Sequence, residues 1–310
     1  MTATSATVHI GFGKTASSSL QTALFRLKPE LEKQGYLYDT ADLPDKQHSH
    51  LAHRLRHGET AAYRHTMQLI SDAFARKRSR HLVLSGENFS GLERDAVAAL
   101  HGDLAAFGAP RAVLYVRNLY RFALSQIAET SKQGRGLAYP HTVLAATRRF
   151  SPTRVIGDWE AVFGADNVLV ESLDDLSVGA NIVDNFLTHI GFAADGPVAD
   201  IRARRSVDPI ASALLTHLAY EFGMSAKDFY AAYFRRMGTR RATPRVETRL
   251  VELAKPWVEK VDLSHPKLAK HAQALTSPPS AGPREAADEL GKYLADLAGV
   301  LLDIAAQKKP

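Results

Sequence analysis

Cysteine is absent from the 310 residues of the chain. This absence excludes disulfide bonds, zinc–thiolate sites and thiol nucleophiles. Long apolar runs are also missing, and no stretch approaches the length needed to span a bilayer. The first residues, 1–7, lack the basic and then apolar pattern of a signal peptide. The sequence therefore predicts a cytoplasmic protein without a transmembrane segment.

The balance of charge favours an anionic partner. The formal net charge is +6 and the sequence pI is about 9.4. The basic residues are scattered, with short clusters at 76–80, 202–205 and 235–245. Neither a zinc-finger spacing nor an RNP-like motif is present, so we do not expect nucleic acid to be the partner. A small polyanionic cofactor or an acidic glycan fits better.

Short apolar segments alternate with helical segments over most of the chain. This order predicts an α/β fold: a three-layer parallel sheet flanked by helices, with a helical C-terminal part. We expect a single domain with a core at about 8–210 and a helical extension at about 211–310. The predicted strands lie at 8–12, within 81–89 with an end at Ser85-Gly86, at 111–117, and within 167–176, which also includes an exit turn. The clearest predicted helices are 17–35, 95–108, 119–134 and 179–192. Ser17 or Ser18 is expected near the N-cap of the first helix.

A proline-rich break at 277–283 precedes an amphipathic helix at 284–306. Packing of this helix on its own domain and a contact within a homodimer are both open.

Chemically active residues follow three of the predicted strands. They lie in Gly11–Ser18, in Ser85–Phe89 and at Arg117. Because the carboxyl ends of parallel strands lie at one edge of a sheet, we expect the three segments to meet there.

The first of these segments has the composition of a phosphate-binding loop. Glycines let the backbone approach a phosphate, a lysine supplies charge, and hydroxyls supply donors. Gly13-Lys14-Thr15 matches the second half of the ATP-binding loop, but its first glycine would fall at Val8. The strict ATP loop is therefore absent. A plain glycine turn with an exposed lysine is the structural alternative.

The segment 9–21, HIGFGKTASSSLQ, resembles the 5′-phosphosulfate loop of sulfotransferases, chiefly the bacterial carbohydrate type. Those enzymes have a fold like that of P-loop NTPases, and their donor is 3′-phosphoadenosine-5′-phosphosulfate (PAPS). The resemblance implies that this loop holds PAPS or its product 3′-phosphoadenosine-5′-phosphate (PAP), without a metal. It assigns the loop contacts to Gly13, Lys14, Thr15, Ala16, Ser17, Ser18 and Ser19.

The same family places an arginine after a strand and a serine eight residues later, both on the 3′-phosphate. Here LYVRNLYRFALSQ supplies Arg117 and Ser125. Arg121 lies between them, and we expect it to be solvated. The basic segment that closes over the 3′-phosphate has two candidates, Arg204-Arg205 and Arg240-Arg241.

Two residues carry the chemistry that the resemblance implies. Lys14 stabilises the leaving oxygen, and Glu87, in LVLSGENF, is the general base toward the acceptor. A capping or salt-bridge role for Glu87 is the structural alternative. The acceptor is expected to be a hydroxyl or amine, on a carbohydrate or a glycolipid.

The loop departs from the family pattern in two places. Ala16 stands where the family usually has glycine, and an alanine is strained there if φ is positive. Ser19 stands where the cytosolic branch stacks an aromatic ring on adenine.

Five histidines fall within 48–65: His48, His50, His53, His57 and His65. We expect this segment to lie over the acceptor cleft, with His48 or His50 touching the acceptor; a plain exposed helix is equally compatible. No ordered carboxylate completes a metal site, so no metal is expected. His9, inside the first strand, is expected to be a hydrogen-bonded core residue.

Two other functions remain open. A small-molecule or nucleotide kinase of the P-loop class would need Mg²⁺ and an intact ATP loop. A non-catalytic module that binds nucleotides or polyanions would need only the basic faces.

Overall fold

The structure is a computed structural model that describes residues 4–132, 151–175, 181–194 and 244–279. The chain divides into two compact units. One consists of Met1–Asn118, Ser151–Arg204 and Asp262–Leu275. The other consists of Leu119–Phe150, Arg205–Val261 and Thr276–Pro310. Each unit is described by itself.

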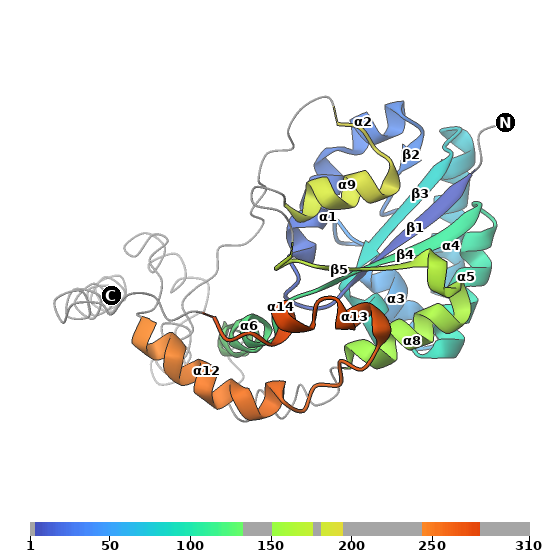
Figure 1. The fold of residues 1–310 in the computed structure, drawn as a ribbon. Helices are drawn as coiled ribbons and strands as arrows, with labels where there is room; N and C mark the ends of the chain where they lie inside the picture. Colours follow the sequence, from blue (N-terminus) through green and yellow to red (C-terminus); the bar gives the residue numbers. More distant parts are fainter. Residues whose placement is uncertain (1–3, 133–150, 176–180, 195–243, 280–310) are drawn as a thin grey trace, which may run out of the picture. The chain divides into compact units, whose positions relative to one another are not determined.

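The first unit is built on a five-stranded sheet in which every pair of neighbours is parallel. The strand order is β2-β3-β1-β4-β5, so β1 lies at the centre (Figure 1). The strands are β1 Ser5–Gly11, β2 Tyr36–Leu37, β3 His81–Gly86, β4 Ala109–Val116 and β5 Val168–Ser172. Residues 6–11 of β1 are all buried, as expected for a parallel strand covered on both faces.

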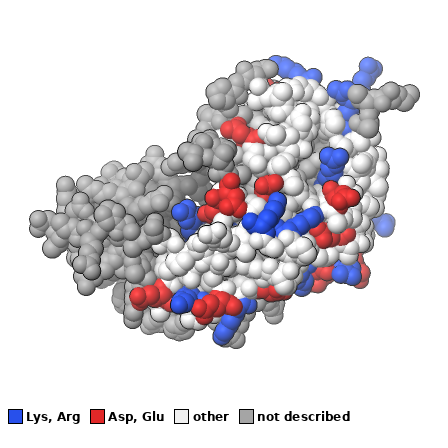
Figure 2. All heavy atoms as spheres, in the orientation of Figure 1, with Lys and Arg blue, Asp and Glu red and all other residues white. Residues whose placement is uncertain are grey.

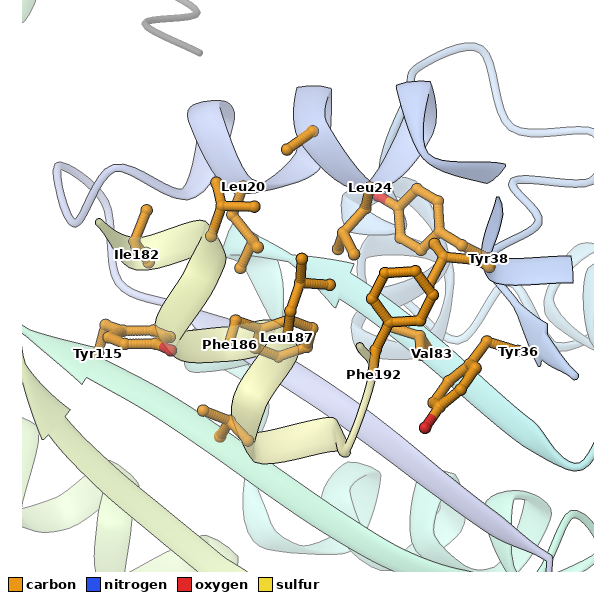
Figure 3. Close-up of a cluster of buried hydrophobic side chains, with 14 residues drawn as sticks. Leu20, Leu24, Tyr36, Tyr38, Val83, Tyr115, Ile182, Phe186, Leu187 and Phe192 are labelled. Carbon is orange, nitrogen blue, oxygen red and sulfur yellow. The ribbon is translucent and has the colours of Figure 1, made fainter. Parts of the chain in front are cut away.

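One face of the sheet is covered by α1 (Ser17–Arg26), α2 (Lys28–Lys33) and α9 (Ile182–Ile190). Leucines of α1 and aliphatic and aromatic side chains of α9 meet over Val83 and Tyr115 (Figure 3). Burial of this cluster is what holds the first helix against the strand that precedes it, at roughly 25 cal/mol per Å² of apolar surface.

Helices α3 (Ser49–Arg56), α4 (Thr60–Arg76), α5 (Arg94–Ala105) and α8 (Pro152–Phe163) connect the remaining strands. Of these, α5 and α8 pack against β4 and against each other, and α3 packs against β3. A short 3-10 turn, η1 (Glu87–Gly91), follows β3, and a second, η3 (Ala165–Asn167), precedes β5. The predicted three-layer α/β arrangement is confirmed.

The single helix predicted over 17–35 is wrong in one respect, because the structure divides it at Leu27 into α1 and α2. Pro29 explains the division. Proline lacks an N–H and is tolerated in the first turn of a helix, but not in its interior. Gly35, at φ 84°, ends the helical segment as predicted.

The outer edge of β5 is covered by a segment from far along the sequence. This segment holds α13 (Pro266–Ala269) and α14 (Ala272–Thr276). His271 is buried, with Nε2 3.4 Å from the carbonyl of Val170 and Nδ1 2.5 Å from Asp175 Oδ2. Covering an edge strand protects its backbone groups from pairing with another chain.

In the second unit, the structure describes α6 (Leu119–Lys132) and α12 (Pro244–Val258). The ring of Phe122 stacks on Trp257, with centroids 5.7 Å apart and planes at 13°. The predicted helix at 284–306 and the two basic pairs Arg204-Arg205 and Arg240-Arg241 lie outside the described residues.

Within the described ranges, no helix has the length and apolar character that a membrane span requires.

Gly108, just before β4, offers a direct test of this fold. Its φ is +120°, and a Cβ there would lie 2.1 Å from the carbonyl oxygen of Thr4. We expect Gly108→Ala to lower the free energy of unfolding by at least about 2 kcal/mol, since backbone strain and a clash with main chain combine. Urea denaturation measures the change.

Gly102, inside α5, is the matched control, because a Cβ there meets nothing within 4 Å. Gly102→Ala should stabilise the unit by about 0.5–1 kcal/mol through helix propensity. Equal unfolding midpoints for the two variants would contradict the described approach of residue 108 to the N-terminal strand.

Candidate functional site

The loop between β1 and α1 is a tight turn closed by its own threonine. The hydroxyl of Thr15 donates to the carbonyl of Phe12 at 2.7 Å, and the Thr15 amide reaches the same carbonyl at 3.4 Å. Thr15 is buried, so its hydroxyl serves the turn. Lys14, next to it, is half-buried and has a positive φ of 68°.

Ala16 is the N-cap of α1, and Ser17, predicted to lie near the N-cap, is the first residue of the helix. Ala16 has φ 59° and ψ 17°, in the left-handed region, and no side chain caps the helix. The strain expected for an alanine in a position that suits glycine is therefore present, at roughly 1–2 kcal/mol. The loop keeps this conformation although alanine disfavours it.

The uncapped first turn leaves amide donors directed at the loop. The amides of Ser17 and Ser18 cannot bond within the helix, and no hydrogen bond from them is found among the described residues. Ser17 is buried, whereas Ser18 and Ser19 are half-buried. Free amides, hydroxyls and the positive end of the helix dipole form the donor set that a phosphate or sulfate group binds.

Arg117 joins this loop from the neighbouring strand. It follows β4 directly, and its Nη1 donates to the carbonyl oxygen of Lys14 at 2.9 Å. A guanidinium carries five N–H donors in a planar fork, a geometry that matches carboxylate and phosphate oxygens. The structure thus brings two of the sequence motifs together, although 103 residues separate them.

The residue after Arg117 is held firmly. The amide of Asn118 donates to Asp174 Oδ2 at 2.5 Å, and its side-chain amide donates to the carbonyl of Ala274 at 2.7 Å. These bonds fix the point at which β4 ends, and with it the start of the Arg117 side chain.

Glu87 reaches the loop from the other side of β1. A Cβ added to Gly11 would lie 2.7 Å from Ser17 Oγ, 3.1 Å from Glu87 Cα and 3.2 Å from Glu87 Cγ. Glycine is therefore required at position 11 for close approach: any side chain would separate the loop from Glu87. The predicted convergence of the three strand-end segments is what the structure shows.

Ser125 lies on α6 and is half-buried, in the second unit. Arg121 on the same helix is exposed. The proposed pairing of Ser125 with Arg117 on one phosphate stays a prediction.

The location of the loop agrees with a general rule for parallel sheets. The connection after β1 runs toward β2, at one edge of the sheet, and the connection after β4 runs toward β5, at the opposite edge. Ligands bind in the crevice beyond two neighbouring strands whose connections diverge in this way. Lys14 and Arg117 follow those two strands.

His48 does not lie at a surface, which corrects the expectation that it touches an acceptor. Its side chain is fully buried. Nδ1 accepts the amide N–H of Ser85 at 3.1 Å, and Nε2 donates to the carbonyl of Asp39 at 2.9 Å. Both nitrogens are used, so His48 is a neutral structural residue.

His50 is half-exposed, with Nε2 3.3 Å from Asp45 Oδ2. His53 on α3 and His57, the C-cap of that helix, are exposed neighbours with ring centroids 4.2 Å apart. In the part of the chain that the structure describes, no three His, Asp or Glu residues are arranged to hold a metal.

His9 is a core residue, as expected. Its Nδ1 lies 2.8 Å from Ser85 Oγ, and its ring meets Tyr115 and Phe186 edge-on. Burial lowers the pKa of His9 from 6.5 to about 3, so the ring is neutral at physiological pH.

Charges of both signs are present on the visible face of the described residues. Figure 2 shows acidic groups interspersed with basic ones on this face. The net positive charge is thus not gathered there into one broad basic patch, and an extended polyanion is not what this face favours.

Comparisons with protein-family models, with curated proteins and with solved structures found no match to this chain.

The roles of several residues of the site were not predicted from the sequence. Gly11 was assigned no role of its own, and Ser49, Asn118 and Asp174 were not singled out at all. Ser49 accepts the amide N–H of Glu87 at 2.9 Å. A serine in a polar helical stretch, 38 residues away in sequence, carries no signal of such a contact.

The burial of His48 makes a prediction about pH. Desolvation lowers its pKa from 6.5 to about 4, against the smaller favourable effects of its two backbone partners and Asp39. The unfolded chain binds this proton below pH 6.5 and the folded chain does not until about pH 4. Stability is therefore fully present above pH 6.5 and is lost between those values, at about 1 kcal/mol per pH unit.

His48→Asn keeps an acceptor for Ser85 and removes the titration. We expect the variant to be less stable than the wild type at pH 7.5, with the gap narrowing steadily toward pH 4.5. Urea unfolding at several pH values measures it. His65→Asn, at an exposed position of α4, is the control for replacing a histidine outside the core. A constant gap for His48→Asn would contradict the neutral, buried state of His48.

Proposed function

We propose that the protein transfers a sulfuryl group from PAPS to a hydroxyl or amine of an acceptor, on a carbohydrate or glycolipid. One observation carries the proposal. The loop Gly11–Ser19 is bonded to Arg117 through the Lys14 carbonyl and packed against Glu87 at Gly11. An anion cradle, a guanidinium and a carboxylate at one edge of a sheet are the parts that this chemistry needs.

The residues present suit the donor. The uncapped first turn of α1, with the Ser17 and Ser18 amides, suits the 5′-phosphosulfate. Arg117, directly beyond the neighbouring strand, suits a second phosphate, because its planar fork matches phosphate oxygens. The family resemblance adds Ser125 to that second phosphate.

The reaction is an in-line displacement at sulfur. The acceptor oxygen or nitrogen bonds to sulfur, and the bond between sulfur and the oxygen of the 5′-phosphate breaks. Lys14 stabilises the negative charge that develops on this oxygen, and the loop amides hold the phosphate in place. The proton of the acceptor goes to Glu87 and then to solvent. PAP and the sulfated acceptor are the products.

The kinase alternative requires Mg²⁺ and a complete ATP-binding loop. The sequence lacks the first glycine of that loop, because Val8 occupies its position. The non-catalytic alternative requires no carboxylate next to the loop, whereas Glu87 packs against Gly11. Both alternatives are outcomes of the following experiment.

Calorimetric binding of PAP tests the proposal. We expect PAP to bind without Mg²⁺ and more tightly than 5′-AMP, because only PAP carries the 3′-phosphate. Arg117→Ala should weaken PAP binding by about ten- to a hundredfold, as expected for a charge-assisted hydrogen bond. Ser125→Ala should weaken PAP binding less and leave 5′-AMP binding unchanged.

Arg111→Ala is the matched control, since Arg111 is exposed on the same strand, β4. It should bind PAP as the wild type does. Preference for ATP with Mg²⁺ would favour the kinase. Equal affinity for PAP and 5′-AMP, or no nucleotide binding, would refute the assignment of a 3′-phosphate site.

A further inference from the structure

Among the described residues, the inner part of strand β3 has a neighbouring strand on one side only. Strand β2 pairs only with His81 and Leu82. Beyond that point, His48 forms the hydrogen bonds to the backbone of Ser85 that a strand would otherwise form. Its amide donates to the Ser85 carbonyl at 2.7 Å, and its Nδ1 accepts the Ser85 amide at 3.1 Å. His48 therefore replaces a strand residue and ties the start of α3 to the end of β3.

The same turn continues onto the candidate base. Ser49 Oγ accepts the amide N–H of Glu87 at 2.9 Å and donates to Gln47 Oε1 at 2.8 Å. The side chain of Asn88 donates to the Ser49 carbonyl at 3.2 Å. Ser49 thus binds Glu87 and its successor at once.

The end of β3 and the start of α3 are tightly packed at Gly86. A Cβ on Gly86 would lie 2.9 Å from the amide nitrogen of Ser49 and 3.0 Å from the carbonyl carbon of His48. The start of α3 is therefore in close backbone contact with the last residue of β3, directly before η1. Movement of the α3 terminus must move the backbone that carries Glu87.

We propose that Ser49, anchored by His48, is a positioning residue that sets the Glu87 carboxylate against the donor loop. Ser49 does not touch the reacting atoms; it fixes the amide of the residue that does. Because Glu87 Cα lies only 3.1 Å from where a Gly11 Cβ would be, a small shift of η1 changes the spacing between carboxylate and loop. Misplacement on this scale costs rate.

The inference rests on the proposed function, and it predicts different effects on kcat and on the affinity for the donor. The donor contacts come from the loop, α1 and Arg117, and none of them comes from α3. Loss of the Ser49 hydroxyl should therefore lower kcat and leave donor affinity unchanged. A residue needed only for folding would lower stability and all functions together.

The assay uses PAPS hydrolysis, so that no acceptor has to be known. A water oxygen bonds to sulfur, and the sulfur–oxygen bond to the 5′-phosphate breaks. One water proton goes to Glu87 and then to solvent, and the hydrogen sulfate that forms loses the other proton to solvent. PAP and sulfate are released. Full-length Ser49→Ala should show kcat reduced about tenfold, with KM for PAPS and Kd for PAP within about twofold of wild type. Ser49→Thr, which keeps the hydroxyl, should restore kcat.

Amide hydrogen exchange provides a readout that is independent of turnover. Ser49→Ala should lose protection at Glu87 and keep it at Leu84, inside β3. Asn88→Ala, at an exposed position that folding tolerates, should lower kcat by a smaller factor. Thr188→Ala is the control, since it removes an exposed hydroxyl that bonds only within α9, to the Asp184 carbonyl, and should change nothing.

The outcomes are distinct. PAP binding and hydrolysis by the wild type, with kcat or Glu87 protection unchanged in Ser49→Ala, would overturn the positioning role alone. A parallel loss of kcat and PAP affinity would also overturn it. Wild-type protein that neither binds PAP nor hydrolyses PAPS would overturn the proposed function, and the inference with it. PAP binding without hydrolysis would contradict Glu87 as the base, and the inference would fall with that assignment.

Discussion

Parallel pairing of β1 with a strand on each side is the constraint on which the rest of the structure depends. In this register, Ile10 lies beside Gly86 and Gly11 lies beside Tyr115. Strands β1, β3 and β4 therefore end at nearly the same level of the sheet. Whatever follows each strand must lie at one edge, and here the followers are a phosphate-type loop, a carboxylate and a guanidinium.

The close spacing at that edge introduces backbone strain at Ala16, which neighbouring contacts offset. Gly11 permits the close approach of Ser17 and of Glu87 to the end of β1. Ala16 holds the helix start in a left-handed conformation at the expense of strain. Strained backbone persists where the surroundings over-determine it. The Arg117 bond to Lys14 and the burial of α1 over the sheet supply that support. A preorganised loop of this kind needs little rearrangement to receive an anion.

Sequence reasoning predicted the parallel sheet and the meeting of the three segments, because apolar strands and their polar followers alternate regularly. It identified Ala16 as a strained position, since glycine is the residue that suits positive φ. It failed at His48. A histidine in a polar, helical stretch has the pattern of a surface residue, and only the shortness of β2 shows why it is buried. The division at Leu27 was foreseeable from Pro29.

A crystal structure of the protein with PAP would show directly which groups hold its two phosphates. We expect the 5′-phosphate on the Ser17 and Ser18 amides beside Lys14, the 3′-phosphate on Arg117, and the Glu87 carboxylate facing the 5′-phosphate. A nucleotide bound elsewhere, or a loop whose amides point away from its phosphate, would contradict the claim that this edge of the sheet is a sulfuryl-transfer site.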